Sequence, residues 1–328
     1  MLRIGILGAA RIAAKFVAGV AGSPKVQVVA IASRDEARAQ TFARAHHVAR
    51  TCATYEALLD SKDIDAIYNP LPNGLHAEWS IRAMDAGKHV LCEKPLAGSV
   101  AEASAMFAAS RRNGVRLVEA YPYRSQPQTL VLQRLLADGA IGRVRTIHAA
   151  FGFMLTAQND IRLDPALAGG ALMDLGSYPL SLIRMISGEA PASVHAIGVM
   201  HPSGVDRSAA ATLAFANGII AQAACSFDTA LYRQALIAGD DGVIETSYAN
   251  HTGNESPPVL LIRRGRDRQG APDVMRVTGI NGFRAEADAF ADHVAGGPWT
   301  GISEAESLDV AAMLDSLRAM VAANARSR

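Results

Sequence analysis

The stretch RIGILGAARIA, residues 3–13, decides the fold of the first third of the chain. Its apolar first half predicts a strand over residues 3–7, and the turn after it leads directly into a helix. Gly8, Ala10 and Ala13 occupy the spacing of the GxGxxG dinucleotide fingerprint. Only Gly8 is glycine, so the motif alone is equally typical of an ordinary strand-to-helix turn. Its position before a helix N-terminus, where anions bind, favours a dinucleotide site.

The rest of the first third alternates short apolar runs with helical patterns, which is typical of a parallel sheet built from strand-helix-strand units. Strands are expected over residues 3–7, 26–32, 66–69, 89–92 and 116–119. Helices are expected over residues 12–20, 36–46, 77–86 and 101–113. The pattern predicts an α/β, Rossmann-like dinucleotide-binding domain over residues 1–121.

From about residue 122 the pattern changes to strands in succession. They are expected over residues 144–153, 193–200, 207–215, 219–227, 234–238 and 259–263, before two terminal helices over residues 284–294 and 304–323. Turn pairs such as Asn217-Gly218 and Asp241-Gly242 indicate hairpins. This α+β pattern predicts a second domain over residues 122–328 with a large, open, mainly antiparallel sheet.

Composition excludes several classes of partner. The 328 residues contain 32 Lys and Arg against 31 Asp and Glu, so nothing indicates a surface for nucleic acid or a membrane. The first apolar run, residues 2–10, contains Arg3 and is too short to span a bilayer, so a cytoplasmic protein is expected. The three isolated cysteines lack the spacing of a disulfide framework or a zinc site, so no metal is expected and they are interpreted as small core residues.

The end of the second strand, IASRDE, tests the choice of cofactor. An NAD site usually has an acidic residue there to bind the ribose hydroxyls, but this chain has Ser33 and Arg34. A hydroxyl and a guanidinium suit a 2′-phosphate, so NADP is favoured over NAD. The alternative is that Arg34 is merely a solvated residue and that Asp35 takes the acid's role one position later.

The stretch HVLCEKPL, residues 89–96, ends an apparently buried strand in a charged pair and a proline. Glu and Lys are costly to bury without a partner or a use. Open α/β sheets bind their ligands beyond the carboxyl ends of their strands. Glu93 and Lys94 are therefore either surface residues or part of a binding site.

Several segments together resemble the glucose-fructose oxidoreductase, inositol dehydrogenase and rhizopine-catabolism (Gfo/Idh/MocA) family. They are GAARIA (residues 8–13), YNPLPNGLHAEWSIRAMDAGKHVLCEKPLA (68–97), EAYPYR (119–124) and GGALMDLGSYPL (169–180). The resemblance implies that Lys94 lies where substrate meets nicotinamide, that the Lys94-Pro95 bond is cis, and that Glu93 is a positioning residue near the cofactor ribose. The candidate cofactor-binding residues are Gly8, Ala10, Arg11, Ile12, Ser33, Arg34, Pro70, Leu71, Asn73, His76, Glu93 and Lys94.

The segment GGALMDLGSYPL also contains Asp174 and Tyr178, which share one face if the segment is helical. The alternative interpretation is that Asp174 caps a helix and Tyr178 packs in the core. The resemblance favours the first reading and implies that Lys94, Asp174 and Tyr178 are catalytic. Gly169 and Gly170 would let the backbone pass close to a ligand, although a simple turn explains them nearly as well.

Hydride removal from a carbinol carbon requires a base for the hydroxyl proton. Tyrosine has an unperturbed pKa of about 10, so it needs a cation beside it to act near neutral pH. We therefore expect Tyr178 to transfer the proton, Lys94 to lower the pKa of Tyr178, and Asp174 to orient the substrate or Lys94. Exchanged roles for Lys94 and Tyr178 remain an alternative.

Other candidates have weaker support. Asn73 and His76 follow Leu71-Pro72 and could contact nicotinamide ribose or substrate, although a surface helix cap explains His76 equally well. Tyr123, Arg124, Gln126 and Arg162 could line a substrate cleft, although packing is the better reading of Tyr123 and simple ion pairs compete for the arginines. The candidate substrate-binding residues are Tyr123, Arg124, Arg162, Asp174 and Tyr178.

The resemblance is greatest to the branch that contains glucose-fructose oxidoreductase, NADP-dependent D-xylose dehydrogenase and dimeric dihydrodiol dehydrogenase. It implies an NADP-dependent enzyme that oxidises an aldose or related polyol. A trans-dihydrodiol dehydrogenase or keto-sugar reductase is the alternative, and a dinucleotide-sensing regulator without catalysis is an alternative of another class. An exposed sheet face indicates a homodimer or homotetramer.

Overall fold

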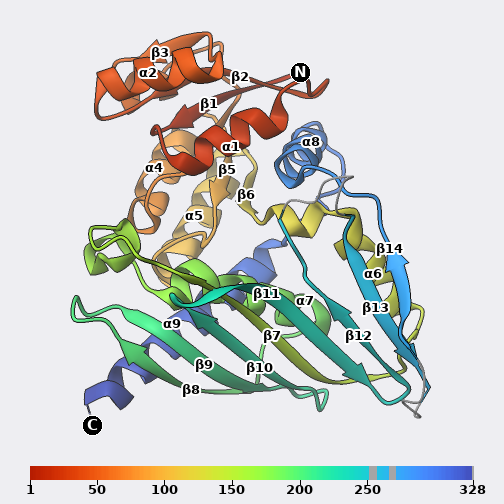
Figure 1. Cartoon of the computed structure of the whole chain (residues 1–328). Coiled ribbons are helices and arrows are strands. Elements are labelled where there is room, and N and C mark those ends of the chain that lie inside the picture. The colour runs from red at the N-terminus through yellow and green to blue at the C-terminus, as the bar shows by residue number, and fades with distance from the viewer. Residues whose placement is uncertain (251–256, 266–270, 327–328) are drawn as a thin grey trace. The chain divides into compact units, whose positions relative to one another are not determined.

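The computed structural model describes residues 1–250, 257–265 and 271–326. The chain divides into two compact units (Figure 1). The first contains Met1–Ser125 and Asn281–Glu304, and the second contains Gln126–Ile280 and Ala305–Arg328. The contiguous second domain expected over residues 122–328 therefore differs from the compact units, because a late segment returns to the first unit.

The first unit is built on a six-stranded parallel sheet with the order β3-β2-β1-β4-β5-β6. The strands are β1 (Leu2–Leu7), β2 (Val26–Ala32), β3 (Arg50–Cys52), β4 (Ala66–Asn69), β5 (His89–Glu93) and β6 (Leu117–Ala120). The helices are α1 (Arg11–Val20), α2 (Glu36–His46), α3 (Tyr55–Leu59), α4 (His76–Asp85), α5 (Val100–Asn113) and α8 (Gly282–Val294), with short 3₁₀ turns η1 (Asn73–Leu75) and η2 (Pro122–Ser125). The predicted Rossmann-like sheet is confirmed.

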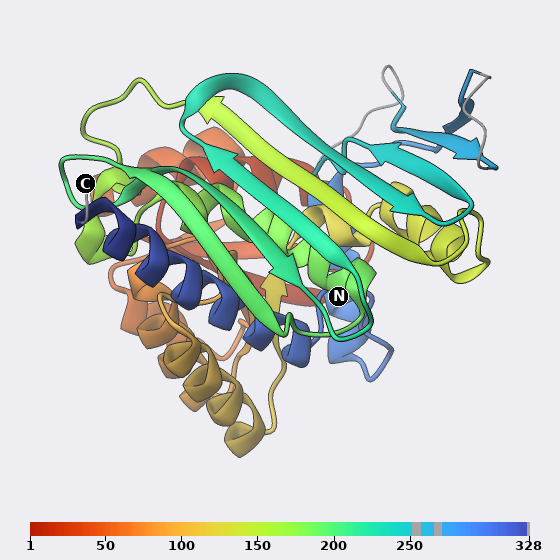
Figure 2. The same ribbon diagram turned by 90° about the horizontal axis from the view of Figure 1, so that it is seen from below.

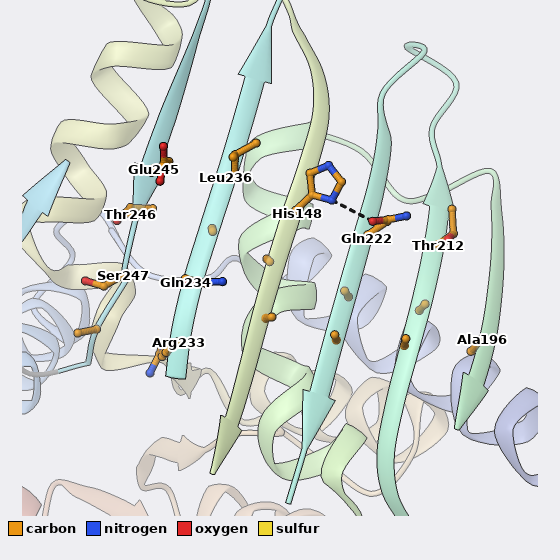
Figure 3. A pocket seen from close by; sticks show the side chains of 18 of the residues that line it. His148, Ala196, Thr212, Gln222, Arg233, Gln234, Leu236, Glu245, Thr246 and Ser247 are labelled. Atoms are coloured by element: carbon orange, nitrogen blue, oxygen red, sulfur yellow. Dashed lines mark hydrogen bonds between the residues drawn. The ribbon is translucent and has the colours of Figure 1, made fainter. Parts of the chain in front are cut away.

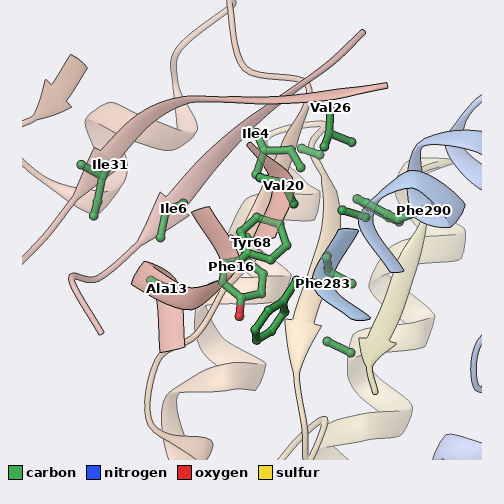
Figure 4. Close-up of a cluster of buried hydrophobic side chains, with 14 of the residues drawn as sticks. Ile4, Ile6, Ala13, Phe16, Val20, Val26, Ile31, Tyr68, Phe283 and Phe290 are labelled. Atoms are coloured by element: carbon green, nitrogen blue, oxygen red, sulfur yellow. The ribbon is translucent and has the colours of Figure 1, made fainter. Parts of the chain in front are cut away.

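The late segment joins the first unit through its aromatic side chains. Phe16 of α1 stacks on Tyr68 of β4 with ring centroids 3.9 Å apart, and Phe283 of α8 meets Phe16 edge-on at 6.0 Å (Figure 4). Phe290 is also fully buried in this cluster. Burying such rings is among the larger contributions to a core, which explains why α8 belongs to this unit.

The second unit is built on an eight-stranded sheet with the order β14-β13-β12-β11-β7-β10-β9-β8. The strands are β7 (Val144–Met154), β8 (Ser193–Met200), β9 (Asp206–Ala214), β10 (Ile220–Ser226), β11 (Asp228–Gly239), β12 (Gly242–Thr246), β13 (Val259–Arg264) and β14 (Asp273–Arg276). Neighbouring strands are antiparallel except β7 and β10, which are parallel. The expected large, mainly antiparallel sheet is confirmed, and the Asn217-Gly218 pair makes the turn between β9 and β10, with Gly218 at φ +85°.

Helices cover one face of this sheet. The helices are α6 (Pro127–Ala137), α7 (Ser177–Ser187) and α9 (Glu304–Arg326), with 3₁₀ turns η3 (Ile161–Leu163) and η4 (Pro165–Leu167) and a π-helical turn η5 (Leu172–Gly176). Helix α7 packs on β7 and β10, while no helix of the described residues covers the opposite face (Figure 2). The segment Pro165–Ser187 is long and apolar enough to cross a membrane, but 83% of its apolar window is buried inside the unit, as in a core helix.

Candidate functional site

The turn after β1 has the backbone geometry of a phosphate-binding turn. Gly8 adopts φ +87° and donates its N–H to the carbonyl of Ala32 at 2.7 Å. A Cβ at Gly8 would lie 3.0 Å from Cδ2 of Leu71, so glycine is needed for both conformation and space. Ala10 has no side-chain oxygen to cap the helix that begins at Arg11, so the first N–H groups of α1 suit an anion. This geometry supports the cofactor role expected for Gly8, Ala10, Arg11 and Ile12.

Asp35, which follows the end of β2, is the N-cap residue of α2. Its carboxylate caps α2 by accepting the N–H of Arg38 at 3.2 Å. Ser33 is buried, whereas Arg34 is exposed and comes directly after it. Asp35 is thus engaged in a cap, which supports the 2′-phosphate interpretation of Ser33 and Arg34 over the ribose-binding acid of an NAD site.

His76 connects the loop after β4 to the end of β5. It is fully buried, and its Nδ1 and Nε2 atoms lie 2.8 Å from the carbonyl of Pro95 and 2.7 Å from that of Leu71. Burial lowers the pKa of His76 to about 4, and the positive charge of Lys94 acts in the same direction. The surface cap considered for His76 is wrong, because the imidazole holds the two loops together. Pro70 and Leu71 are buried in the same loop, and Asn73 begins η1.

Glu93 is the last residue of β5, and Lys94 follows it directly. Glu93 is buried, and it accepts the hydroxyl of Tyr68 at 2.7 Å and the N–H of Lys94 at 3.3 Å. The Lys94-Pro95 bond is cis, as the resemblance implied. Glu93 is thus fixed by hydrogen bonds, which suits a positioning role, while Lys94 is partly exposed.

Two more buried carboxyl groups lie near Glu93. Glu119 accepts the N–H of Leu96 at 2.9 Å. Glu286 of α8 is 1% exposed, and burial together with the charges of Glu93 and Glu119 holds the pKa of Glu286 well above its usual range. Glu286 therefore keeps its proton to higher pH than an exposed glutamate does. Its sequence neighbourhood, FRAEADAF, resembles an ordinary amphipathic helix and gave no sign of this role.

The residues around η2 are buried. Tyr123 is fully buried and meets Tyr121 edge-on with ring centroids 6.0 Å apart, which supports the packing interpretation. Arg124 is 3% exposed. In the second unit, the Nε2 group of Gln126 donates to the carbonyls of Asn250 and Ile280 at 2.7 and 2.9 Å, so this amide anchors loops.

In the second unit, Arg162 lies between two carboxylates. Its Nε donates to Asp174 at 2.5 Å, and its Nη1 lies 3.2 Å from Oδ1 of Asp160. The charge of Asp174, followed by hydrogen bonding, raises the pKa of the Arg162 guanidinium above its usual value. The predicted candidates Arg162 and Asp174 are thus brought together as an ion pair.

The local geometry around Asp174 differs from the expected regular helix. Asp174 lies in the π-helical turn η5, while Tyr178 lies at the start of α7, so the same-face argument for a 3.6-residue period does not apply between them. The paired glycines before this turn serve close packing. A Cβ at Gly169 would lie 2.5 Å from the carbonyl of Arg162, and one at Gly170 would clash with Asp206. Packing therefore explains both glycines without a ligand.

Tyr178 lies in a pocket of aromatic and polar side chains. Its ring meets Phe151 edge-on at 5.5 Å, and its hydroxyl accepts a hydrogen bond from Nδ2 of Asn250 at 2.8 Å. The guanidinium carbon of Arg233 lies 4.1 Å from the Tyr178 ring centroid. Sequence reasoning missed Arg233 and Asn250, and the only signal was a charged residue inside the apolar strand LYRQALIA.

The fold and these two groups of residues define a class, that of two-domain oxidoreductases with a Rossmann cofactor domain. The model of the oxidoreductase family with an NAD-binding Rossmann fold matches residues 2–121, and the GFO/IDH/MocA C-terminal domain matches residues 129–245. The chain belongs to the Gfo/Idh/MocA family of oxidoreductases.

Relatives in this family act on different substrates. The chain is 36% identical to D-xylose 1-dehydrogenase (NADP(+)) 2 of Haloferax volcanii, over 96% of both chains. It is 33% identical to trans-1,2-dihydrobenzene-1,2-diol dehydrogenase of Danio rerio, over 98% of this chain and 97% of that one. Among solved structures, the 3-ketoreductase KijD10 of Actinomadura kijaniata, in complex with NADP and TDP-benzene, is 31% identical with a TM-score of 0.89 over 98% of both chains. The chain is thus an enzyme of the sugar and polyol oxidoreductase class.

Proposed function

We propose that the chain is an NADP-dependent aldose dehydrogenase that oxidises the anomeric hydroxyl to a lactone. The observation that carries this substrate class is the 36% identity with an NADP-dependent D-xylose dehydrogenase over 96% of both chains. The Asp35 cap, which leaves Ser33 and Arg34 at the end of β2, supports NADP.

The mechanism assigns one task to each of three side chains. Bound NADP supplies the hydride acceptor. Tyr178, whose oxygen accepts the N–H of Asn250, takes the proton of the substrate hydroxyl. Lys94 stabilises the developing alkoxide, and Asp174, fixed by Arg162, orients the substrate.

An assay of cofactor reduction tests the proposal. Purified protein would be mixed with NADP or NAD and with D-xylose, D-glucose, L-arabinose, myo-inositol or a dihydrodiol, while the absorbance of reduced nicotinamide is followed. Reduction of NADP by a pentose or hexose is the expected result. Turnover of the dihydrodiol alone would overturn the choice of an aldose.

A keto-sugar reductase is the second candidate. It is supported by 34% identity over 92% of this chain to the dTDP-3,4-didehydro-2,6-dideoxy-alpha-D-glucose 3-reductase of Saccharopolyspora spinosa. Oxidation of NADPH by a keto-sugar, without reaction in the forward direction, would favour it. The oxidoreductase family supports either enzyme over a regulator that only senses dinucleotide. A cytoplasmic location remains the expectation for both.

We also propose that a second copy of the chain covers the open face of the eight-stranded sheet. Ile197, Val199 and Ile220 are 60%, 61% and 52% exposed on this face. Next to them is a hollow of about 1460 Å³ (Figure 3). Within it, Nδ1 of His148 lies at hydrogen-bond distance, 2.9 Å, from Oε1 of Gln222. Exposed apolar side chains on a broad sheet face suit a twofold interface.

Sedimentation velocity tests this dimer. At micromolar concentration we expect a dimer or tetramer, and Ile197→Asp should shift it toward monomer because a charge would be buried. Ile161→Asp is the matched control, since Ile161 is 53% exposed on η3 and outside the sheet. A wild-type monomer would contradict the proposal.

A further inference from the structure

The half-buried side chain of Arg233, in the second unit, is surrounded by aromatic rings. The guanidinium carbon of Arg233 lies 4.1 Å from the ring centroid of Tyr178, 4.6 Å from that of Tyr248 and 5.0 Å from that of Phe151. The Nε and Nη2 atoms of Arg233 are buried. Three π faces thus surround a charge in a region of low dielectric, where cation–π interactions are strongest.

The sheet register determines this arrangement. Arg233 of β11 lies directly opposite Phe151 of β7, and it shares its side of the strand with the buried residues Ala235 and Ile237. That side faces α7, which carries Tyr178. The charge therefore points into the helix-covered face of the sheet, where an arginine has no general packing advantage.

The third ring is held in place by a strained backbone. Tyr248 has φ +33°, which is rare for a bulky residue. Its N–H donates to Oγ1 of Thr246 at 3.2 Å, and its hydroxyl donates to the carbonyl of Ala150 at 3.1 Å. Strain of this kind persists only where the surroundings fix it, and it is found most often at functional sites. Two residues later, Asn250 donates to the hydroxyl of Tyr178.

The charge of Arg233 acts differently on the two forms of Tyr178. A phenol offers the guanidinium only the negative face of its ring, whereas a phenolate carries a full negative charge partly shared with that ring. The cation therefore stabilises the phenolate more than the phenol. The hydrogen bond from Asn250 acts in the same direction, because a donor to the phenolic oxygen strengthens as that oxygen gains charge.

We propose that Arg233 is a positioning residue that stabilises the phenolate of Tyr178 and holds its ring in place for proton transfer. The inference rests on the proposed role of Tyr178 and adds a second cation to the one expected from Lys94. It gives a role to an arginine that points into the helix-covered face of the sheet.

Nuclear magnetic resonance tests the ionisation without any turnover. The protein would be labelled with carbon-13 at the hydroxyl-bearing ring carbon of its seven tyrosines. The signal missing from Tyr178→Phe identifies Tyr178, and its shift is followed with pH. In Arg233→Met, which keeps an unbranched apolar side chain, the titration midpoint should move to higher pH by about one to two pH units. Arg233→Lys keeps the positive charge and should return the midpoint most of the way to the wild-type value, and Arg233→Gln replaces Arg233→Met if the Met variant does not fold.

A matched control separates this effect from a general loss of charge. Arg145→Met removes an arginine of β7 whose partner is Asp240, and it should leave the Tyr178 midpoint in place. An unchanged midpoint in the neutral Arg233 variant would overturn the inference. An equal change in Arg145→Met would also overturn it, because the effect would then be nonspecific.

Kinetics provide the second readout. In Arg233→Met, kcat should fall about tenfold near neutral pH and recover as the pH rises, with KM nearly unchanged. A loss that is equal at every pH would indicate a structural role only. If Tyr178→Phe keeps full activity while the Tyr178 midpoint still depends on Arg233, the proposed function fails and the effect of Arg233 on Tyr178 stands.

Discussion

In the first unit the candidate site residues follow successive parallel strands, whereas in the second unit they come from segments far apart in the chain. Ser33, Leu71 and Lys94 each lie just beyond the carboxyl end of a strand or in the loop after it. Around Tyr178 gather Phe151, Arg233 and Asn250, from β7, β11 and the segment after β12. In the parallel sheet, strand topology alone brings the functional residues to one edge. In the mixed sheet, the residues around Tyr178 come together only because the strands pair in one particular register.

The candidate site residues of the two units also differ in how they hold charge. In the first unit, burial and nearby like charges raise the pKa of Glu286 and lower that of His76, which disfavours the charged form of each. The second places cations next to carboxylates or rings, as Arg162 does with Asp174 and Arg233 with Tyr178. Substitutions of Glu286 and His76 should therefore change how the stability of the first unit depends on pH. Substitutions around Tyr178 should change the rate of catalysis.

The largest effect should come from removing the proposed catalytic group of either unit. Lys94→Met and Tyr178→Phe should each lower kcat/KM by about two to four orders of magnitude, because each removes a group that stabilises charge only in the transition state. Steady-state kinetics with the best aldose measures both. Lys62→Met and Tyr232→Phe are the matched controls, and a loss below tenfold in either test variant removes that residue from the mechanism.

The next effect should be on cofactor choice, at the end of β2. Replacing Ser33 and Arg34 by alanine should weaken NADP binding by about 10- to 100-fold and leave NAD binding nearly unchanged, since charge-assisted hydrogen bonds to a 2′-phosphate would be lost. Fluorescence titration with both dinucleotides measures the ratio, with Arg44→Ala on the neighbouring helix α2 as control.

The competing role of Asp35 is tested in the same assay. Asp35→Ala should cost about 1 kcal/mol of stability through loss of the α2 cap, with no change in the ratio of the two affinities. A selective loss of NAD binding in Asp35→Ala would show that this residue serves as the ribose acid after all.

His76 should make the first unit sensitive to acid. Because its folded pKa is lowered from 6.5 to about 4, the stability it contributes is present above pH 6.5 and is lost as the pH falls toward 4. Between neutral pH and pH 5 the loss should be about 2 kcal/mol. Guanidinium unfolding followed by tryptophan fluorescence measures it selectively, since both tryptophans, Trp79 and Trp299, lie in the first unit.

His76→Asn is the comparison for this test. The variant should be less stable than the wild type at neutral pH, because the bridge between the Leu71 and Pro95 carbonyls is altered, but its stability should depend less on pH. Equal pH dependence of the two proteins would show that His76 is not the responsible group.

The same contrast explains what the sequence could predict. The strands of the first sheet were found from their apolar runs, except β3, whose three residues Arg50–Cys52 are too short to show a pattern. The return of α8 to the first unit could not be found, because Phe283 and Phe290 pack against residues near the other end of the chain, such as Phe16. In the site, motif residues such as Lys94 and Tyr178 were named, but Arg233 depends on the pairing of β11 with β7, which no local pattern specifies.

The smallest effect should come from Glu286. Burial and the charges of Glu93 and Glu119 raise the pKa of Glu286, so the folded chain holds this proton to higher pH than the unfolded chain does. Its contribution to stability is complete below the unfolded pKa of 4.5 and is lost as the pH rises, because the unfolded chain gives up the proton first. Glu286→Gln, which is neutral at every pH, should therefore gain stability relative to the wild type as the pH increases. Tryptophan-detected unfolding in acidic and in mildly alkaline buffer measures this gain.

Glu36→Gln is the matched control, because Glu36 is an exposed acid at the start of α2 and its pH dependence should follow that of the wild type. If the Glu286→Gln variant instead loses stability relative to the wild type as the pH rises, Glu286 folds as a carboxylate. Such a carboxylate beside Glu93 and Glu119 would need a cation near it, and the contrast between the Glu286 site of the first unit and the paired charges around Asp174 and Tyr178 would then disappear.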